Sequence, residues 1–206
     1  MASPFLYFAD ERLSPAELSA ACLDGDLVEL GDAYIPADAV ETRALRAGSL
    51  RGILGSTIAA THLSAAWIHG ALSEPPARHT VQRAVSRRLH HVMGRRFLYR
   101  DLAVDIDDLL LVGGVWVTTP GRTLADLSRI ADASHVHAAQ RLAETHPGLR
   151  AEAIAWLDDH RGLPGRGAAL ATLREAAAHE TSEGGTAGES AARASAEGER
   201  DSVRTT

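Results

Sequence analysis

The apolar segment 109–118 sets the strongest constraint on the fold. Its sequence is Leu-Leu-Leu-Val-Gly-Gly-Val-Trp-Val-Thr. Two runs of strand-forming residues joined by a two-glycine turn predict a β-hairpin, and we expect this hairpin to supply central strands of a sheet. Thr119 and Pro120 follow directly as a helix cap and a first helical residue, so a helix is predicted from there to about residue 131.

The N-terminal part predicts one helix and a second hairpin. Ser14 is a helix cap, proline follows it, and Glu17 is placed to close a capping box, which together predict a helix over 15–24. Residues 27–36 then read as strand, tight turn and strand. A helix followed by a hairpin is the second half of a winged helix. Because few residues precede the helix, we expect a truncated winged-helix-like module over 1–38.

The rest of the chain predicts an α+β fold. Residues 75–118 alternate apolar stretches with turn-like residues, which favours a β-meander. The spacing of apolar residues and the stop signals predict further helices over 39–54, 62–69, 135–145, 149–160 and 166–178. We therefore expect a partial winged-helix element and then a mixed α/β core domain over 39–178, with the β-meander and C-terminal helices.

The last segment, 179–206, is predicted to be a disordered acidic tail. After His179 its only sizeable apolar residue is Val203. Such a composition buries too little to offset the cost of ordering a chain, about 1–2 kcal/mol per residue. The remainder, in a chain of 206 residues that is 45% hydrophobic, suits one main domain.

Composition excludes several kinds of site. All 21 basic residues are arginine, so a P-loop lysine, a Schiff-base lysine and the lysine of restriction-type nucleases are impossible. The single cysteine, Cys22, excludes an internal disulfide, and no Cys-x-x-Cys spacing exists for zinc. We expect no catalysis, no cofactor and no metal. The apolar run at 4–8 is too short for a signal peptide or a membrane span, so we expect a cytoplasmic location.

Charge is segregated along the chain although the formal net charge is −6. Residues 17–41 contain seven acids and no arginine, whereas residues 75–100 contain seven arginines and no acid. Strand periodicity would place arginines of the second segment on one sheet face and so form a surface for phosphates. The candidates are Arg83, Arg87, Arg88, Arg95 and Arg96. The alternative is a solvated sheet face balanced by the acidic N-terminus or tail.

Two sequence blocks resemble the signature stretches of AbiEi-type antitoxins. Residues 61–70 read Thr-His-Leu-Ser-Ala-Ala-Trp-Ile-His-Gly, and residues 117–127 read Val-Thr-Thr-Pro-Gly-Arg-Thr-Leu-Ala-Asp-Leu. A third piece, Gly-Leu-Pro-Gly-Arg at 162–166, is similar to the closing segment of such proteins. The motif residues are His62, Ser64, His69, Thr119, Pro120, Arg122 and Asp126. The resemblance covers roughly residues 25–175.

The resemblance implies an antitoxin or transcriptional regulator. In such proteins a winged helix binds operator DNA, and the following domain assists repression and opposes a nucleotidyltransferase toxin. Here the helix over 15–24 contains no arginine and carries an acid, Glu17, at its start, whereas phosphate contact requires positive charge. The alternative is therefore a protein-interaction module that has lost its DNA-reading helix.

Two residue pairs within the blocks allow more than one interpretation. His62 and His69 lie two turns apart on one helical face. Either the two side chains bind the same partner or phosphate, or one caps the helix and the other is a buried structural histidine. Arg122 and Asp126 are four residues apart, with Arg122 free to reach across to the His62 helix. This pair indicates an architectural ion-pair network, and a ligand-binding arginine is the alternative.

Overall fold

The computed structural model describes residues 4–10, 12–89 and 94–179, and it confirms the α+β fold. The helices and strands in chain order are α1 (Pro15–Asp24), β1 (Leu27–Leu30), β2 (Ala33–Pro36), α2 (Arg43–Ser49), α3 (Arg51–Leu54), β3 (Ile58–Ala60), α4 (His62–Ile68), β4 (His79–Arg83), β5 (Phe97–Ala103), the 3-10 turn η1 (Ile106–Asp108), β6 (Leu109–Val112), β7 (Val115–Thr118), α5 (Pro120–Ser128), α6 (Ala133–Ala143) and α7 (Leu149–Asp159). Residues 166–179 form one more helix. The tail expected to be disordered lies almost entirely outside the described residues.

The N-terminal helix and hairpin form as predicted. Ser14 accepts a hydrogen bond from the Glu17 backbone N–H, and the Glu17 side chain accepts from the Ser14 N–H, which completes the capping box of α1. Strands β1 and β2 pair antiparallel in a sheet of their own. Tyr7 adds a bridge beside this hairpin, because its N–H and C=O bond those of Tyr34 at 2.9 Å each.

The main sheet has five strands in the order β5-β4-β3-β7-β6, which corrects the predicted meander. The hairpin of β6 and β7 is confirmed. However, β4 pairs parallel with β5, and β3 pairs parallel with β7, so successive strands do not simply fold back on one another. Parallel pairing requires a crossover connection, and turn-like residues alone do not distinguish a crossover from a hairpin. The sheet order also leaves β6 at an edge, so only β7 of the hairpin is central.

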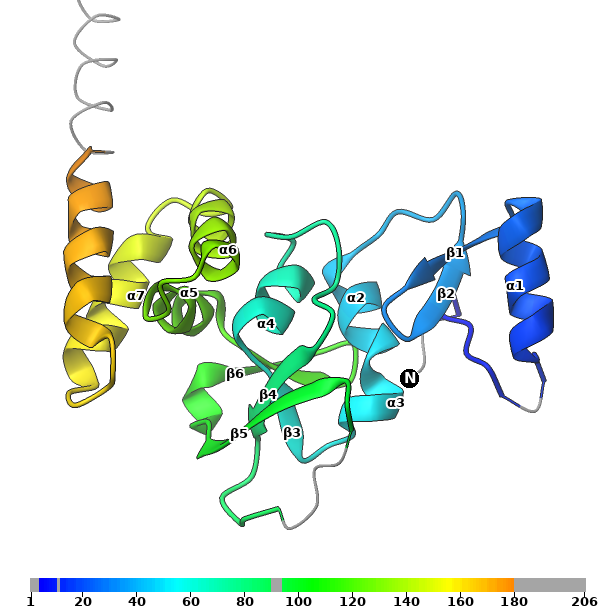
Figure 1. The fold of residues 1–206 in the computed structure, drawn as a ribbon, viewed down its shortest axis with the longest axis horizontal. Helices are drawn as coiled ribbons and strands as arrows, with labels where there is room; N and C mark the ends of the chain where they lie inside the picture. The colour runs from blue at the N-terminus through cyan, green and yellow to red at the C-terminus, as the bar shows by residue number, and fades with distance from the viewer. Residues whose placement is uncertain (1–3, 11, 90–93, 180–206) are drawn as a thin grey trace, which may run out of the picture.

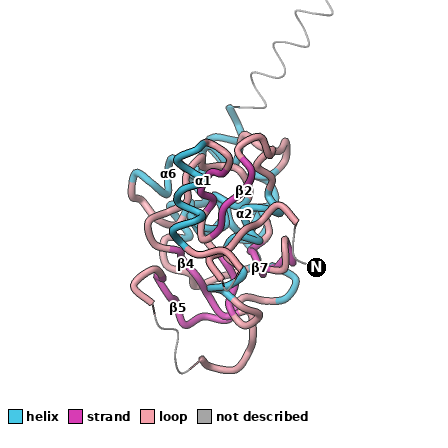
Figure 2. Tube along the Cα trace, turned by 90° about the vertical axis from the view of Figure 1, so that its right-hand side faces the viewer, coloured by secondary structure: helices cyan, strands magenta, loops and turns pink. Residues whose placement is uncertain are grey.

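Two hydrophobic clusters meet at α4. One cluster lies between α2, α4 and the sheet and includes Leu50, Trp67 and Val81. The other joins α4 to α5, α6, α7 and the last helix and includes Leu124 and Leu142. Figure 1 accordingly shows the sheet in the middle, the C-terminal helices on one side and the N-terminal hairpin with α1 on the other. From the side of α1, most helices lie above the strands of the main sheet (Figure 2).

The helix predicted over 39–54 begins later and is divided. Thr42 is its cap and accepts a hydrogen bond from the Leu45 N–H at 3.3 Å. The helix ends at Leu50, where the short α3 begins. Gly48 of α2 lies directly beneath the β6–β7 turn. A Cβ atom added to Gly113 of that turn would lie 2.8 Å from the Gly48 nitrogen. The close approach explains the glycine at position 113, whereas a Cβ on Gly48 would instead meet Leu6 Cδ1 at 2.7 Å.

Replacing Gly113 with alanine should therefore destabilise the protein by more than about 2 kcal/mol. Its φ of 57° is left-handed, and an added Cβ would lie 2.4 Å from the Ala44 carbonyl oxygen. Gly25→Ala isolates the backbone effect, because φ is 84° there but no atom lies within 4 Å of the added Cβ. We expect this variant to lose about 1 kcal/mol of unfolding free energy.

The control for both variants is Gly52→Ala, a helical position with open space around it. That change should stabilise the fold by about 0.5–1 kcal/mol. Urea unfolding followed by circular dichroism measures all three. Equal stabilities for the Gly113 and Gly25 variants would contradict the close packing of the turn on α2.

Candidate nucleic-acid interface

The two motif blocks come together in the fold, as expected. Helix α4 packs against α5, and His69 at the end of α4 donates from Nε2 to the Thr118 carbonyl at 2.7 Å. The hydroxyls of Thr118 and Thr123 lie 2.7 Å apart and are buried. These contacts tie α4, the end of β7 and the start of α5 into one unit. The blocks therefore form the scaffold of the domain.

His62 and Ser64 lie inside this scaffold. His62 is the buried first residue of α4, with a left-handed φ of 50°, and its Nδ1 lies 3.0 Å from the Thr61 hydroxyl. His69 is the C-cap residue of the same helix. Ser64 accepts a hydrogen bond from the Thr80 N–H at 2.9 Å and so fixes α4 on β4. No group of three or more His, Cys, Asp or Glu side chains suited to a metal occurs in the part of the chain that the structure describes.

Burial lowers the pKa of both motif histidines, His62 and His69. Desolvation lowers the pKa of His62 to about 4, against an opposing attraction from Asp126. Desolvation likewise lowers the pKa of His69 to about 4, although the hydrogen bond to the Thr118 carbonyl opposes the shift. Both side chains are therefore neutral at physiological pH and serve as hydrogen-bonding core residues.

The predicted Arg122–Asp126 pair belongs to a larger ion-pair network. Arg122 Nε lies 2.9 Å from Asp126 Oδ2, and Arg129 approaches the other oxygen at 3.0 Å. The Asp126 residue is only 1% exposed, so its charge depends on these two guanidinium groups. Thr119 and Pro120 start the helix as predicted, because the Thr119 hydroxyl accepts from the Arg122 N–H at 3.3 Å.

Arg122 contacts η1 and α7 and forms no hydrogen bond or ion pair with the described His62 helix, which corrects the expected partner. It reaches Asp108 in η1 at 2.6 Å and stacks over the Trp156 ring at 4.1 Å. Trp156 Nε1 in turn donates to Asp108 at 2.9 Å. The sequence motifs did not predict a role for Asp108, Arg129 or Trp156 in this network. The three-residue spacing of Asp126 and Arg129 was a usable signal, whereas the other contacts cross between distant segments.

Of the five candidate arginines, Arg83 does not face solvent. It is 8% exposed, and its Nε lies 2.9 Å from the Asp101 carboxylate. Its guanidinium also donates to the Ser86 carbonyl at 2.6 Å. Arg83 therefore holds the backbone that leaves β4, and its assignment as a phosphate-facing residue is wrong.

The other four arginines are exposed on the two described segments of the β4–β5 connection, 84–89 and 94–96. Arg87 and Arg95 have exposed side chains. The Arg88 side chain is 81% exposed, at 3.7 Å from Asp101, and the Arg96 side chain is 60% exposed and paired with Asp32 of the β1–β2 turn. Both segments project beyond the main sheet (Figure 1). We name these four residues the arginine surface.

A family model described as AbiEi antitoxin C-terminal domain matches residues 58–168. A search of curated proteins found no match. The matched range contains the sheet, both motif blocks and all four arginines. No helix in the described ranges has the length and apolar content that crossing a membrane requires.

Asp126→Asn should lower the free energy of unfolding by about 3 kcal/mol, because it leaves two guanidinium groups short of a buried counter-charge. The control is Glu144→Gln, which breaks an exposed ion pair with Arg141 and should cost less than about 0.5 kcal/mol. Chemical denaturation measures both. Similar losses in the two variants would show that the buried network does not stabilise the fold.

Stability should fall as pH is lowered from about 6.5 to about 4. The folded-state pKa of His62 and of His69 lies below the unfolded value, so between these limits the unfolded chain binds more protons. His69→Gln keeps an N–H donor for Thr118 and should remove about half of the pH dependence that the two histidines cause.

The matched control for that titration is His137→Gln, at an exposed position of α6. It should leave the pH dependence unchanged. Unfolding free energies measured across the range provide the test, and a His69→Gln curve parallel to wild type would contradict the buried neutral histidine.

Proposed function

The chain belongs to the AbiEi antitoxin family, and from this premise we propose that it is an antitoxin and regulator that binds duplex DNA through the phosphates facing its arginine surface. The observation that supports the proposal is the exposure of Arg87, Arg88, Arg95 and Arg96 on neighbouring segments. Arginine is suited to phosphate because its planar fork presents several donors.

The backbone around the arginine surface is held from within. Arg83 donates to the carbonyls of Val85 and Ser86, which lie directly before Arg87 and Arg88. Asp101 neutralises Arg83, whereas Arg88 lies farther from the same carboxylate. One arginine of this segment thus positions the chain and leaves its neighbours available to anions.

The N-terminal module, unlike the arginine surface, offers little positive charge. Helix α1 has no basic residue in its last turn and only one buried residue, Leu18. Arg96 pairs with Asp32, which places the β1–β2 turn next to the arginine surface. We propose that this winged-helix-like module borders the DNA contact through its turn, while α1 makes no phosphate contact.

A second candidate function is supported by the exposed face of α1 and β1. Asp24, Asp26 and Glu29 are exposed there beside Leu23, which is 89% exposed. An acidic face with an exposed leucine suits a basic protein surface better than DNA. In the proposal this face contacts the cognate toxin, which is a nucleotidyltransferase, and the contact takes place in the cytoplasm. The chain itself is proposed to catalyse no reaction.

Duplex DNA titrated against the full chain tests the DNA proposal. Binding followed by fluorescence anisotropy should weaken steeply with salt, and Arg87→Ala together with Arg88→Ala should reduce the slope of log K against log salt by about 2. The charge-matched control is Arg141→Ala with Arg174→Ala, on the C-terminal helices. This control should bind like wild type.

Absence of binding at low salt would exclude the DNA proposal. Equal slopes for the two double variants would place the contact elsewhere on the molecule. In either case, retained binding of a basic protein probe that is lost in Leu23→Asp would favour the interaction module.

A further inference from the structure

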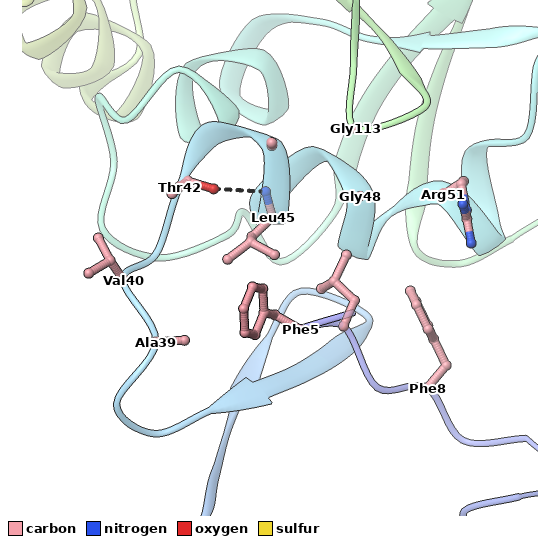
Figure 3. A pocket seen from close by; sticks show the side chains of 11 residues that line it. Phe5, Phe8, Ala39, Val40, Thr42, Leu45, Gly48, Arg51 and Gly113 are labelled. Carbon is pink, nitrogen blue, oxygen red and sulfur yellow. Dashed lines mark hydrogen bonds between the residues drawn. The ribbon is translucent and has the colours of Figure 1, made fainter. Parts of the chain in front are cut away.

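An open apolar pocket of about 530 Å³ lies between the N-terminal segment and α2. Its walls come from α2, from Arg51 and from two irregular segments, and the turn at Gly113 borders it (Figure 3). The lining residues of the two segments are Phe5, Leu6, Phe8, Ala39, Val40 and Thr42. This volume is within the range of pockets that enclose small molecules, roughly 300–1,000 Å³. The pocket lies apart from the arginine surface, since no residue of that surface lines it.

Strand pairing and small side chains explain why the pocket exists. Tyr7 is fixed beside β2 by its two hydrogen bonds to Tyr34. Side chains alternate along an extended segment, so Leu6 and Phe8 point to the face opposite Tyr7, toward α2. Helix α2 presents Ala44 and Gly48 on that face, and among the described residues no bulky side chain fills the space between.

The helix and the segment cannot close this space by moving together. A Cβ on Gly48 would already meet Leu6 Cδ1 at 2.7 Å, so Leu6 is in contact with the helix at this point. The hollow remains to either side of that contact. Phe5 and Val40 stay at the opening with 53% and 80% of their surface exposed, which leaves apolar area that a ligand would cover.

The polar groups of the lining indicate the charge of the occupant. Thr42 already uses its hydroxyl oxygen to cap α2, at 3.3 Å from the Leu45 N–H. Arg51 is the one charged residue of the lining. Its side chain is exposed and forms no hydrogen bond or ion pair within the described part of the chain. It lies at the same end of the pocket as Phe8, far from Val40 (Figure 3).

We propose that this pocket binds a small molecule with an apolar body and one anionic group, such as a carboxylate. The body lies against Phe5, Leu6 and Leu45, and the anion pairs with Arg51. Charge complementarity decides in favour of this class, because a neutral apolar molecule would leave the guanidinium without a partner and a cation would be repelled. The site requires neither DNA nor toxin and stands independently of the proposed function.

Isothermal titration of the full chain with octanoate, in the absence of DNA, tests the site. The matched ligand is 1-octanol, which has the same chain length without the charge. We expect octanoate to bind with one site and to raise the melting temperature, and octanol to bind about three- to tenfold more weakly. Equal affinities would exclude a role for Arg51 in recognising charge and would overturn the proposal.

Two variants locate the binding. Arg51→Gln should weaken octanoate about three- to tenfold and leave octanol unchanged, because only the charged contact is lost. Ala44→Leu fills the pocket and should weaken both ligands more than tenfold, with circular dichroism confirming that the variant is folded. Octanoate binding that neither variant alters, or no binding by the wild type, would contradict the site and leave the DNA proposal untouched.

Discussion

The buried carboxylate of Asp126 is the interaction on which the arrangement of this domain depends. Arg122 of the same helix and Arg129 at its C-cap reach it, and Arg122 continues to Asp108 in η1, just before β6. Trp156 of α7 donates to the same Asp108. A single network therefore joins α5 to the edge of the sheet and to the C-terminal helices. Because a buried charge without partners is costly, these elements are constrained to one relative placement.

The arginines proposed to bind DNA lie in the β4–β5 connection of the sheet that this network contacts. Arg83 and its neighbouring arginines have different structural roles. Asp101 and backbone carbonyls satisfy Arg83 inside the fold, whereas Arg87 and Arg95 remain exposed. The arginine-rich segment of the sequence therefore forms an exposed basic surface only in part. Arg83 is used inside the fold to hold the segment, and Arg96 is paired with Asp32.

Local signals were read correctly from the sequence, and contacts between distant segments were not. The capping box at Ser14, the double-glycine hairpin and the Thr119–Pro120 helix start all depend on residues close in the chain, and all form as predicted. The parallel pairing of β4 with β5 depends on how a long connection returns to the sheet, which periodicity does not encode. For the same reason the burial of Arg83 was missed, because its partner Asp101 lies on the next strand.

Arginine-selective modification with phenylglyoxal, read by mass spectrometry with and without duplex DNA at low salt, tests the central claim most directly. It reports each guanidinium separately in the wild-type chain. We expect DNA to protect Arg87, Arg88 and Arg95, while Arg141 and Arg174 react as they do without DNA. Uniform reactivity across all five, or protection confined to the C-terminal helices, would contradict the assignment of the arginine surface to DNA.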